Sequence, residues 1–267
     1  MHEDKYKIVV PLMYADKKKT TFIGLKLKNR PEVIGRITDV LADANVNVLN
    51  GIHSVSEDRR FSYWIFIADL SNAKLTTEEI MRRIRSMDDV ISLDHGIRWF
   101  NNLGLPSFST ELTLMGEKVV IWRGLWATFF FRSILDEFKE GGEAFMYHVG
   151  RRAGHMAAKW WLTRTSICDV KRLLKLALEI WRALGWIKNY DVPELCIGPP
   201  KFLVILYGLY TCEPFRGSGD RPRGHLARGM LTGYLEEILG ISLSSSERKC
   251  IARGDPFCEV FVCSEDC

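Results

Sequence analysis

Hydrophobic and polar positions in the first hundred residues follow two different periods. Between Thr21 and Lys28 apolar and polar side chains alternate, which is typical of a half-buried strand. From Val33 to Leu41 the apolar positions recur at helical spacing, after a proline that suits the first turn of a helix. Further strands are predicted at 45–50, 61–68 and 89–94, and a second helix from Thr76. The order strand, helix, strand, strand, helix, strand predicts a ferredoxin-like βαββαβ domain over residues 1–100.

The pattern changes after this domain. Residues 101–117 contain Asn, Gly, Pro and Ser without periodicity, so we expect a linker there. Residues 119–138 are rich in aromatic and aliphatic side chains. Helical patterns follow at 145–161, 169–184 and 225–239, and strand patterns at 186–190, 202–210, 247–252 and 258–262. Helices followed by a small antiparallel sheet predict a second α+β domain over residues 118–267. Two domains also agree with a length of 267 residues, which exceeds what one core usually holds.

Composition and charge limit the classes of molecule that the protein is expected to bind. The formal net charge is +4, but acidic and basic residues interleave along the chain, so no continuous basic face for nucleic acid is expected. No apolar run approaches the ~20 residues that a membrane-spanning helix needs, and the first residues lack the apolar region of a signal peptide. We therefore expect a cytoplasmic protein without a nucleic-acid or membrane partner.

The cysteines suggest chemistry near the end of the chain. All seven follow residue 167, and Cys250, Cys258, Cys263 and Cys267 lie within the last 18 residues. In a cytosolic chain such clustering favours a metal or redox site over structural disulfides. Cys250 and Cys258 lie on two predicted strands joined by a turn, and Glu247 precedes Cys250 by three residues, so two thiolates and a carboxylate could meet at a zinc ion. The alternatives are half-buried small side chains or a cross-strand disulfide.

Aromatic and small side chains in the second domain could surround a ligand. The candidate ligand-binding residues are Trp122, Trp126, Phe130, Gly150, Gly154, Trp160, Tyr207 and Tyr210. The alternative is that the aromatic residues fill a solid core. Neither a Gly-x-Ser-x-Gly nor a His-Glu-x-x-His motif is present, and the Gly217-Ser-Gly219 segment lacks the Lys-Ser/Thr of a phosphate loop, so the motifs do not favour an enzyme.

The segment Leu27-Lys-Asn-Arg-Pro-Glu-Val-Ile-Gly-Arg-Ile-Thr-Asp-Val-Leu-Ala-Asp-Ala-Asn-Val-Asn-Val resembles the opening of ACT domains. The resemblance implies a domain that dimerises through its sheet and often binds an amino acid near the first turn, here formed by Asn29, Arg30, Pro31 and Gly35. Glu32 stands where that family commonly has glycine. We therefore expect a dimerising module here in preference to an amino-acid sensor.

Three segments of the second domain resemble the 4-vinyl reductase domain family. They are Phe145–His155, Arg228–Gly240 and the stretch from Ser246 with its Glu-x-x-Cys and Gly-Asp-Pro-x-Cys motifs. The resemblance implies a fold shared with subunits of the trafficking complex TRAPP, an apolar pocket and hydrocarbon binding.

In phenol-sensing relatives of that family, the matching glutamate and two cysteines bind zinc together with a fourth ligand, a cysteine. The fourth position corresponds here to Gly224, and its neighbour His225 is an acceptable substitute. The resemblance therefore implies a zinc site formed by His225, Glu247, Cys250 and Cys258.

Together these observations predict a homodimeric regulatory protein that senses a small hydrophobic ligand and acts through a protein partner. The ACT-like domain would form the dimer and the 4-vinyl reductase-like domain would bind the ligand. Two alternatives stay open: an enzyme or accessory factor of tetrapyrrole or aromatic metabolism, and a TRAPP-like assembly adaptor.

Overall fold

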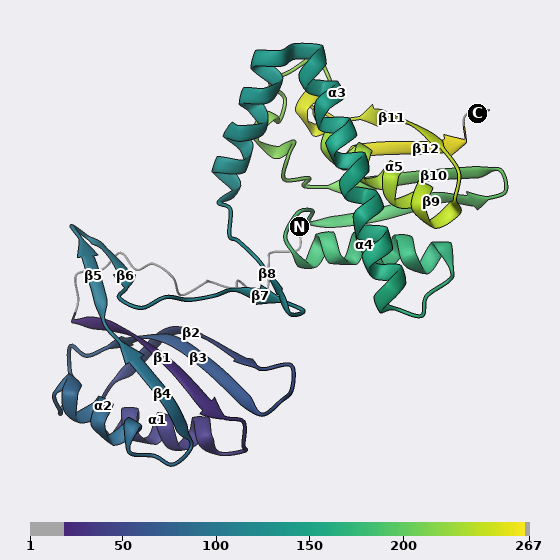
Figure 1. Ribbon diagram of the computed structural model, residues 1–267. Coiled ribbons are helices and arrows are strands. Elements are labelled where there is room, and N and C mark those ends of the chain that lie inside the picture. Colours follow the sequence, from purple (N-terminus) through teal and green to yellow (C-terminus); the bar gives the residue numbers. More distant parts are fainter. Residues whose placement is uncertain (1–18, 265–267) are drawn as a thin grey trace. The chain divides into compact units, whose positions relative to one another are not determined.

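The computed structural model describes residues 19–264, which form two compact units that divide between Val120 and Ile121 (Figure 1). The first unit contains the strands β1 (Thr20–Lys28), β2 (Asn47–Val55), β3 (Phe61–Asp69) and β4 (Val90–His95), with the helices α1 (Val33–Asp43) and α2 (Thr77–Arg85). The strands form one antiparallel sheet in the order β2-β3-β1-β4. The predicted ferredoxin-like βαββαβ arrangement is confirmed.

Apolar faces of both helices and of the sheet form the core of this unit. Ile37 and Leu41 of α1 and Ile80 of α2 are buried against alternate residues of β1 and β3. The N-terminus of α2 has the predicted capping box, because Thr76 and Glu79 satisfy each other's backbone N–H groups. These local signals explain why the sequence pattern predicted this unit closely.

The expected linker contains short strands. β5 (Ile97–Phe100) pairs with β6 (Leu103–Pro106), and β7 (Thr113–Leu114) pairs with β8 (Glu117–Lys118). Phe108 from the same stretch lies against Gly24 of β1, at a position where a Cβ atom would come within 2.8 Å of the ring. Residues 103–108 therefore belong to the first unit.

The second unit contains the helices α3 (Gly124–Arg164), α4 (Val170–Ala183) and α5 (His225–Leu239). Its strands β9 (Asn189–Ile197), β10 (Pro200–Tyr207), β11 (Leu243–Lys249) and β12 (Cys258–Ser264) form an antiparallel sheet in the order β11-β12-β10-β9. Two short 3-10 helices, η1 (Glu213–Phe215) and η2 (Ile251–Arg253), follow β10 and β11. The predicted α+β class is confirmed, although the strand expected at 186–190 begins at Asn189 and runs to Ile197.

One face of this sheet carries the core of the second unit. Phe202, Val204 and Leu206 of β10 are fully buried together with Val260 and Val262 of β12. Leu178 of α4 and Leu231 of α5 belong to the same cluster, so both helices cover that face.

Helix α3 consists of two legs joined at Lys139, where φ is 49° and ψ is −123° (Figure 1). The second leg packs closely on α5, because glycines from both helices face backbone atoms of the other. A Cβ atom at Gly150 or Gly154 would overlap the carbonyl oxygen of an α5 residue, and one at Gly233 would overlap the carbonyl oxygen of Arg151. Only residues without a side chain permit this approach.

Candidate metal centre and apolar pocket

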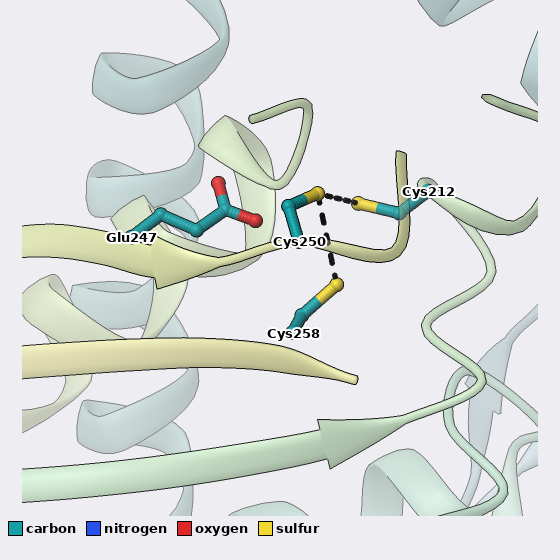
Figure 2. Close-up of side chains that lie close together, drawn as sticks. All are labelled: Cys212, Glu247, Cys250 and Cys258. Atoms are coloured by element: carbon teal, nitrogen blue, oxygen red, sulfur yellow. Dashed lines mark hydrogen bonds between the residues drawn. The ribbon is translucent and has the colours of Figure 1, made fainter. Parts of the chain in front are cut away.

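Four metal-ligating side chains converge at one end of the second sheet (Figure 2). They are Cys212, Glu247, Cys250 and Cys258, and one potential ligand atom from each lies within 4.8 Å of those of the others. The Sγ atom of Cys250 lies 3.7 Å from that of Cys212 and 3.8 Å from that of Cys258. This cluster can hold a metal ion.

The backbone brings these residues together in two ways. Glu247 lies in β11, where the pairing with β12 shifts in register before Lys249, and Cys250 follows directly after the strand. The chain then turns through η2 and Gly254, whose φ of 95° suits glycine, and returns to Cys258 at the start of β12. Cys212 reaches the cluster from the turn between β10 and η1.

Hydrogen bonds orient the Cys250 thiol. Its Sγ atom accepts a bond of 3.4 Å from the backbone N–H of Arg223, while its own N–H donates to Asp255 at 2.7 Å. The bonds with the Cys212 and Cys258 thiols lower the pKa of Cys250, and the bond with Cys250 raises the pKa of Cys212 well above its ordinary value. The thiolate character is therefore concentrated on the central cysteine.

The Glu247 carboxyl group is the polar member of the cluster. Its Oε2 atom accepts a bond of 3.0 Å from the N–H of Gly224, whereas its buried Oε1 atom has no hydrogen-bond partner among the described residues. Burial and the neighbouring Cys250 raise the pKa of Glu247 to about 9. A buried carboxyl oxygen without a partner is costly unless a proton or a cation satisfies it. Three sulfur ligands and one carboxylate suit tetrahedral zinc, so the residues fit such an ion.

The structure places His225 outside this cluster. Among the described residues, the cluster contains Cys212 in place of the His225 that the sequence predicts. His225 is buried at the start of α5, and its Nε2 atom lies 3.9 Å from Oε2 of Glu143. Gly224 precedes His225, and a Cβ atom there would come within 2.5 Å of Glu247 Oε1. Because glycine has no side chain, it leaves room for the Glu247 carboxylate.

Cys250 and Cys258 are free thiols, and both are fully buried. The disulfide alternative is therefore not formed between them. Cys267 lies outside the described residues.

A separate apolar pocket of about 140 Å³ lies between the three helices of the second unit. Its walls include Gly154 and Trp161 of α3, Ala177 and Trp181 of α4, Tyr234 of α5 and Trp186. The Tyr234 hydroxyl donates a hydrogen bond of 3.0 Å to the carbonyl oxygen of Leu173, and burial raises its pKa to about 12. Because this hydroxyl is already bonded, the pocket offers a ligand mainly hydrophobic contacts.

The pocket contains one of the eight residues expected to bind a ligand, Gly154. Gly150 packs on the α5 backbone, and the Tyr207 hydroxyl donates to Asp191. Trp122, just before α3, and Trp126 and Phe130, on its first leg, are exposed. Trp160 lies against Trp161, and Tyr210 contacts both Phe131 and Trp186. Trp181 and Trp186 were missed, although the amphipathic pattern of residues 169–184 could have indicated a buried tryptophan.

The turn between β1 and α1 in the first unit is held by polar contacts. The Asn29 side chain donates to the carbonyl oxygen of Arg59 at 2.8 Å, and the buried Asp89 forms ion pairs with Arg30 and Arg36.

Pro31 and Glu32 form the turn itself, and Glu32 adopts a left-handed conformation with φ 72°. A Cβ atom at Gly35 would meet nothing within 4 Å. The conformation at Glu32 explains why a glycine suits this position.

Residues 21–85, which lie in the first unit, match the family model of the ACT domain. A relative in Methanocaldococcus jannaschii, an uncharacterized protein, is 26% identical over 127 residues, which cover 47% of this chain and 67% of the relative. Within residues 19–264, no helix combines the length and the apolar character that crossing a bilayer requires.

Solved structures similar to this chain include the phenol-responsive sensory domain of the transcription activator PoxR, crystallised with phenol. It is 14% identical, with a TM-score of 0.49, and the match covers 63% of this chain and 84% of the other. A vinyl-4-reductase family protein from Methanocaldococcus jannaschii is 20% identical, with a TM-score of 0.39 over 54% of this chain and 82% of the other.

Proposed function

We propose that the protein is a regulatory, ligand-sensing protein whose second unit binds a small hydrophobic molecule in the pocket between α3, α4 and α5. The ACT domain would serve as its dimerising module, and a partner protein would receive the signal. The observation that carries the proposal is the pocket of about 140 Å³ with three tryptophans in its wall.

Size and chemistry define the ligand class. An apolar cavity of about 150 Å³ is large enough for a benzene-sized molecule. The walls combine flat indole rings with the small residues Gly154 and Ala177, which leaves space for a planar ring. The ligand is therefore a compact aromatic or aliphatic molecule without a charge.

Thermal unfolding in the presence of small aromatic hydrocarbons tests this proposal. Toluene is expected to raise the unfolding temperature of the full chain, because a ligand that binds only the folded state stabilises it by mass action. Trp181→Ala removes one wall, and the matched control Trp99→Ala changes a partly exposed tryptophan in the other unit. Absence of a ligand-induced shift in the wild type, or equal shifts in the wild type and both variants, contradicts binding in this pocket.

We further propose that Cys212, Glu247, Cys250 and Cys258 hold one zinc ion. The ion would supply a structural cross-link between the turn after β10 and the β11–β12 connection, and it would satisfy the orphaned Glu247 oxygen. With four protein ligands the site is closed, which is the usual form of a structural zinc site.

Metal analysis of purified variants tests both the ion and the ligand set. Wild type and Cys168→Ser, whose thiol is exposed and does not belong to the cluster, are expected to contain about one equivalent of zinc. Cys212→Ser should lower the zinc affinity at least tenfold, whereas His225→Gln should leave it unchanged. The reverse result, with His225→Gln losing zinc and Cys212→Ser keeping it, contradicts the Cys212 assignment. A wild type without zinc after preparation in zinc-containing medium contradicts the site itself.

A further inference from the structure

Three buried side-chain atoms within residues 19–264 have no hydrogen-bond partner, and both residues that carry them adjoin Gly224. They are Nδ1 and Nε2 of His225, which follows Gly224, and Oε1 of Glu247. The N–H of Gly224 donates to the other Glu247 oxygen at 3.0 Å, and a Cβ atom on this glycine would come within 2.5 Å of Oε1. Buried polar atoms without a partner are rare in folded proteins, and an ion is one of the explanations for them.

A polar cleft of about 540 Å³ lies at the kink of α3 in the same unit. Its acidic wall residues are Asp136, Glu140, Glu143 and Asp220, and its basic ones are Lys139, Arg221 and Arg223. Asp136 and Glu140 are more than half exposed, so they lie at the rim, and each faces an exposed arginine. The attraction of these rim carboxylates for a cation is therefore partly cancelled.

Glu143 is the acid that connects the cleft with the interior. Its side chain is 24% exposed, and its Oε2 atom lies 3.9 Å from Nε2 of His225, a residue that is 9% exposed. This distance is too long for a hydrogen bond. Zinc bonds to imidazole and carboxylate measure ~2.0–2.2 Å, so one ion can contact both residues across the gap. Burial lowers the pKa of His225, so its imidazole is neutral at pH 7 and has a lone pair for a cation.

These groups form a continuous order of potential ligands from the cleft to the thiol cluster. His225 follows Glu143 inward, and Glu247 lies beside the glycine that precedes His225. The three thiols beyond Glu247 are fully buried, so an ion reaches them only through the protein. A cation without ligands in a protein interior costs far more free energy than one that passes between ligands.

We propose that Glu143 and His225 form the entry route by which zinc passes from the cleft at the α3 kink to Glu247 and the three thiols. This inference rests on the zinc site proposed above. Each step exchanges one ligand for the next and leaves the charge of the ion unchanged. Glu143 and His225 offer two ligands, whereas the cluster offers four, so the equilibrium favours the cluster.

Zinc exchange in the full-length protein tests this route, because an entry route changes rates and leaves the equilibrium affinity unchanged. Glu143→Gln removes the charge of the first ligand, and we expect it to slow zinc release to an excess of chelator about tenfold or more. Zinc uptake by the metal-free protein should slow by the same factor, because the affinity is the ratio of the two rate constants. His225→Gln should act in the same way. The matched control Glu137→Gln removes an exposed charge of the same helix outside the cleft wall and should exchange zinc at the wild-type rate.

The equilibrium affinity separates the outcomes. A wild type that binds no zinc contradicts the zinc site and the route with it, whereas unchanged exchange rates in zinc-binding Glu143→Gln and His225→Gln contradict the route alone. Lowered affinity in either variant would make that residue a permanent ligand and would also overturn the route. Zinc release that accelerates with urea in parallel with global unfolding would show that the ion leaves through the unfolded protein, which excludes the route as well. Glu143 is partly exposed, so Glu143→Gln keeps the test decisive if His225→Gln fails to fold.

Discussion

A substitution that fills the pocket distinguishes an empty cavity from a packed core. Ala177 of α4 is buried and forms part of the pocket wall, so Ala177→Leu extends three carbon atoms into the space. A cavity of about 140 Å³ lowers stability by at most about 3.4 kcal/mol, at ~24 cal/mol per Å³. Burying three more carbons raises the free energy of unfolding by about 2.4 kcal/mol, and the lost rotamer freedom of leucine lowers it by ~0.5–1 kcal/mol. We expect a net gain near 1.5 kcal/mol and loss of toluene binding.

Urea unfolding and toluene-dependent thermal unfolding of the same protein measure both effects. Ala183→Leu is the matched control, since it adds the same atoms to an exposed position of the same helix. The control should change the free energy of unfolding by no more than ~0.5 kcal/mol and should keep the toluene response. If Ala177→Leu lowers stability by 1 kcal/mol or more, the space is already filled and the reasoning is wrong. Retained toluene binding in Ala177→Leu would be equally damaging.

Three further variants test other parts of the structure. Glu32→Gly should raise the free energy of unfolding by about 1 kcal/mol in urea, because glycine adopts the positive φ of this position without strain. Gly233→Ala should lower it by at least ~2 kcal/mol, because the new methyl group overlaps the carbonyl oxygen of Arg151; unchanged stability would show that α3 and α5 do not approach this closely. Burial lowers the pKa of His225, so its contribution to stability is present above pH 6.5 and is lost as the pH falls through the lower folded-state value. His225→Gln should therefore lose less stability than wild type between pH 7 and pH 5, measured by urea unfolding; parallel profiles would contradict this.

The sequence predicted the first unit well because its signals are local. The alternation in β1, the helical spacing from Val33 to Leu41 and the capping box at Thr76 each depend on neighbouring residues only. The start and end of α5 were also predicted, since a Pro- and Gly-rich segment precedes His225 and Gly240 follows Leu239. The pocket could not be predicted in the same way, because its walls come from three helices whose packing depends on glycine contacts between distant segments.

Cys212, the fourth member of the cluster, shows the same limit of prediction from local sequence most clearly. The spacing of Glu247, Cys250 and Cys258 could be read from the sequence, since one turn joins them. Cys212 lies 38 residues before Cys250, and only the pairing of β10 with β12 brings its turn to the cluster.

This arrangement also connects the cluster with the pocket. The turn that carries Cys212 includes Tyr210, whose backbone N–H donates a bond of 2.9 Å to the carbonyl oxygen of Trp186, a residue of the pocket wall. The Tyr210 and Trp186 rings are also in contact, with centroids 5.6 Å apart. An ion held by Cys212 would therefore restrain one wall of the pocket, whereas an ion held by His225 would restrain the start of α5 instead. The choice of the fourth ligand thus determines which part of the ligand site depends on the metal.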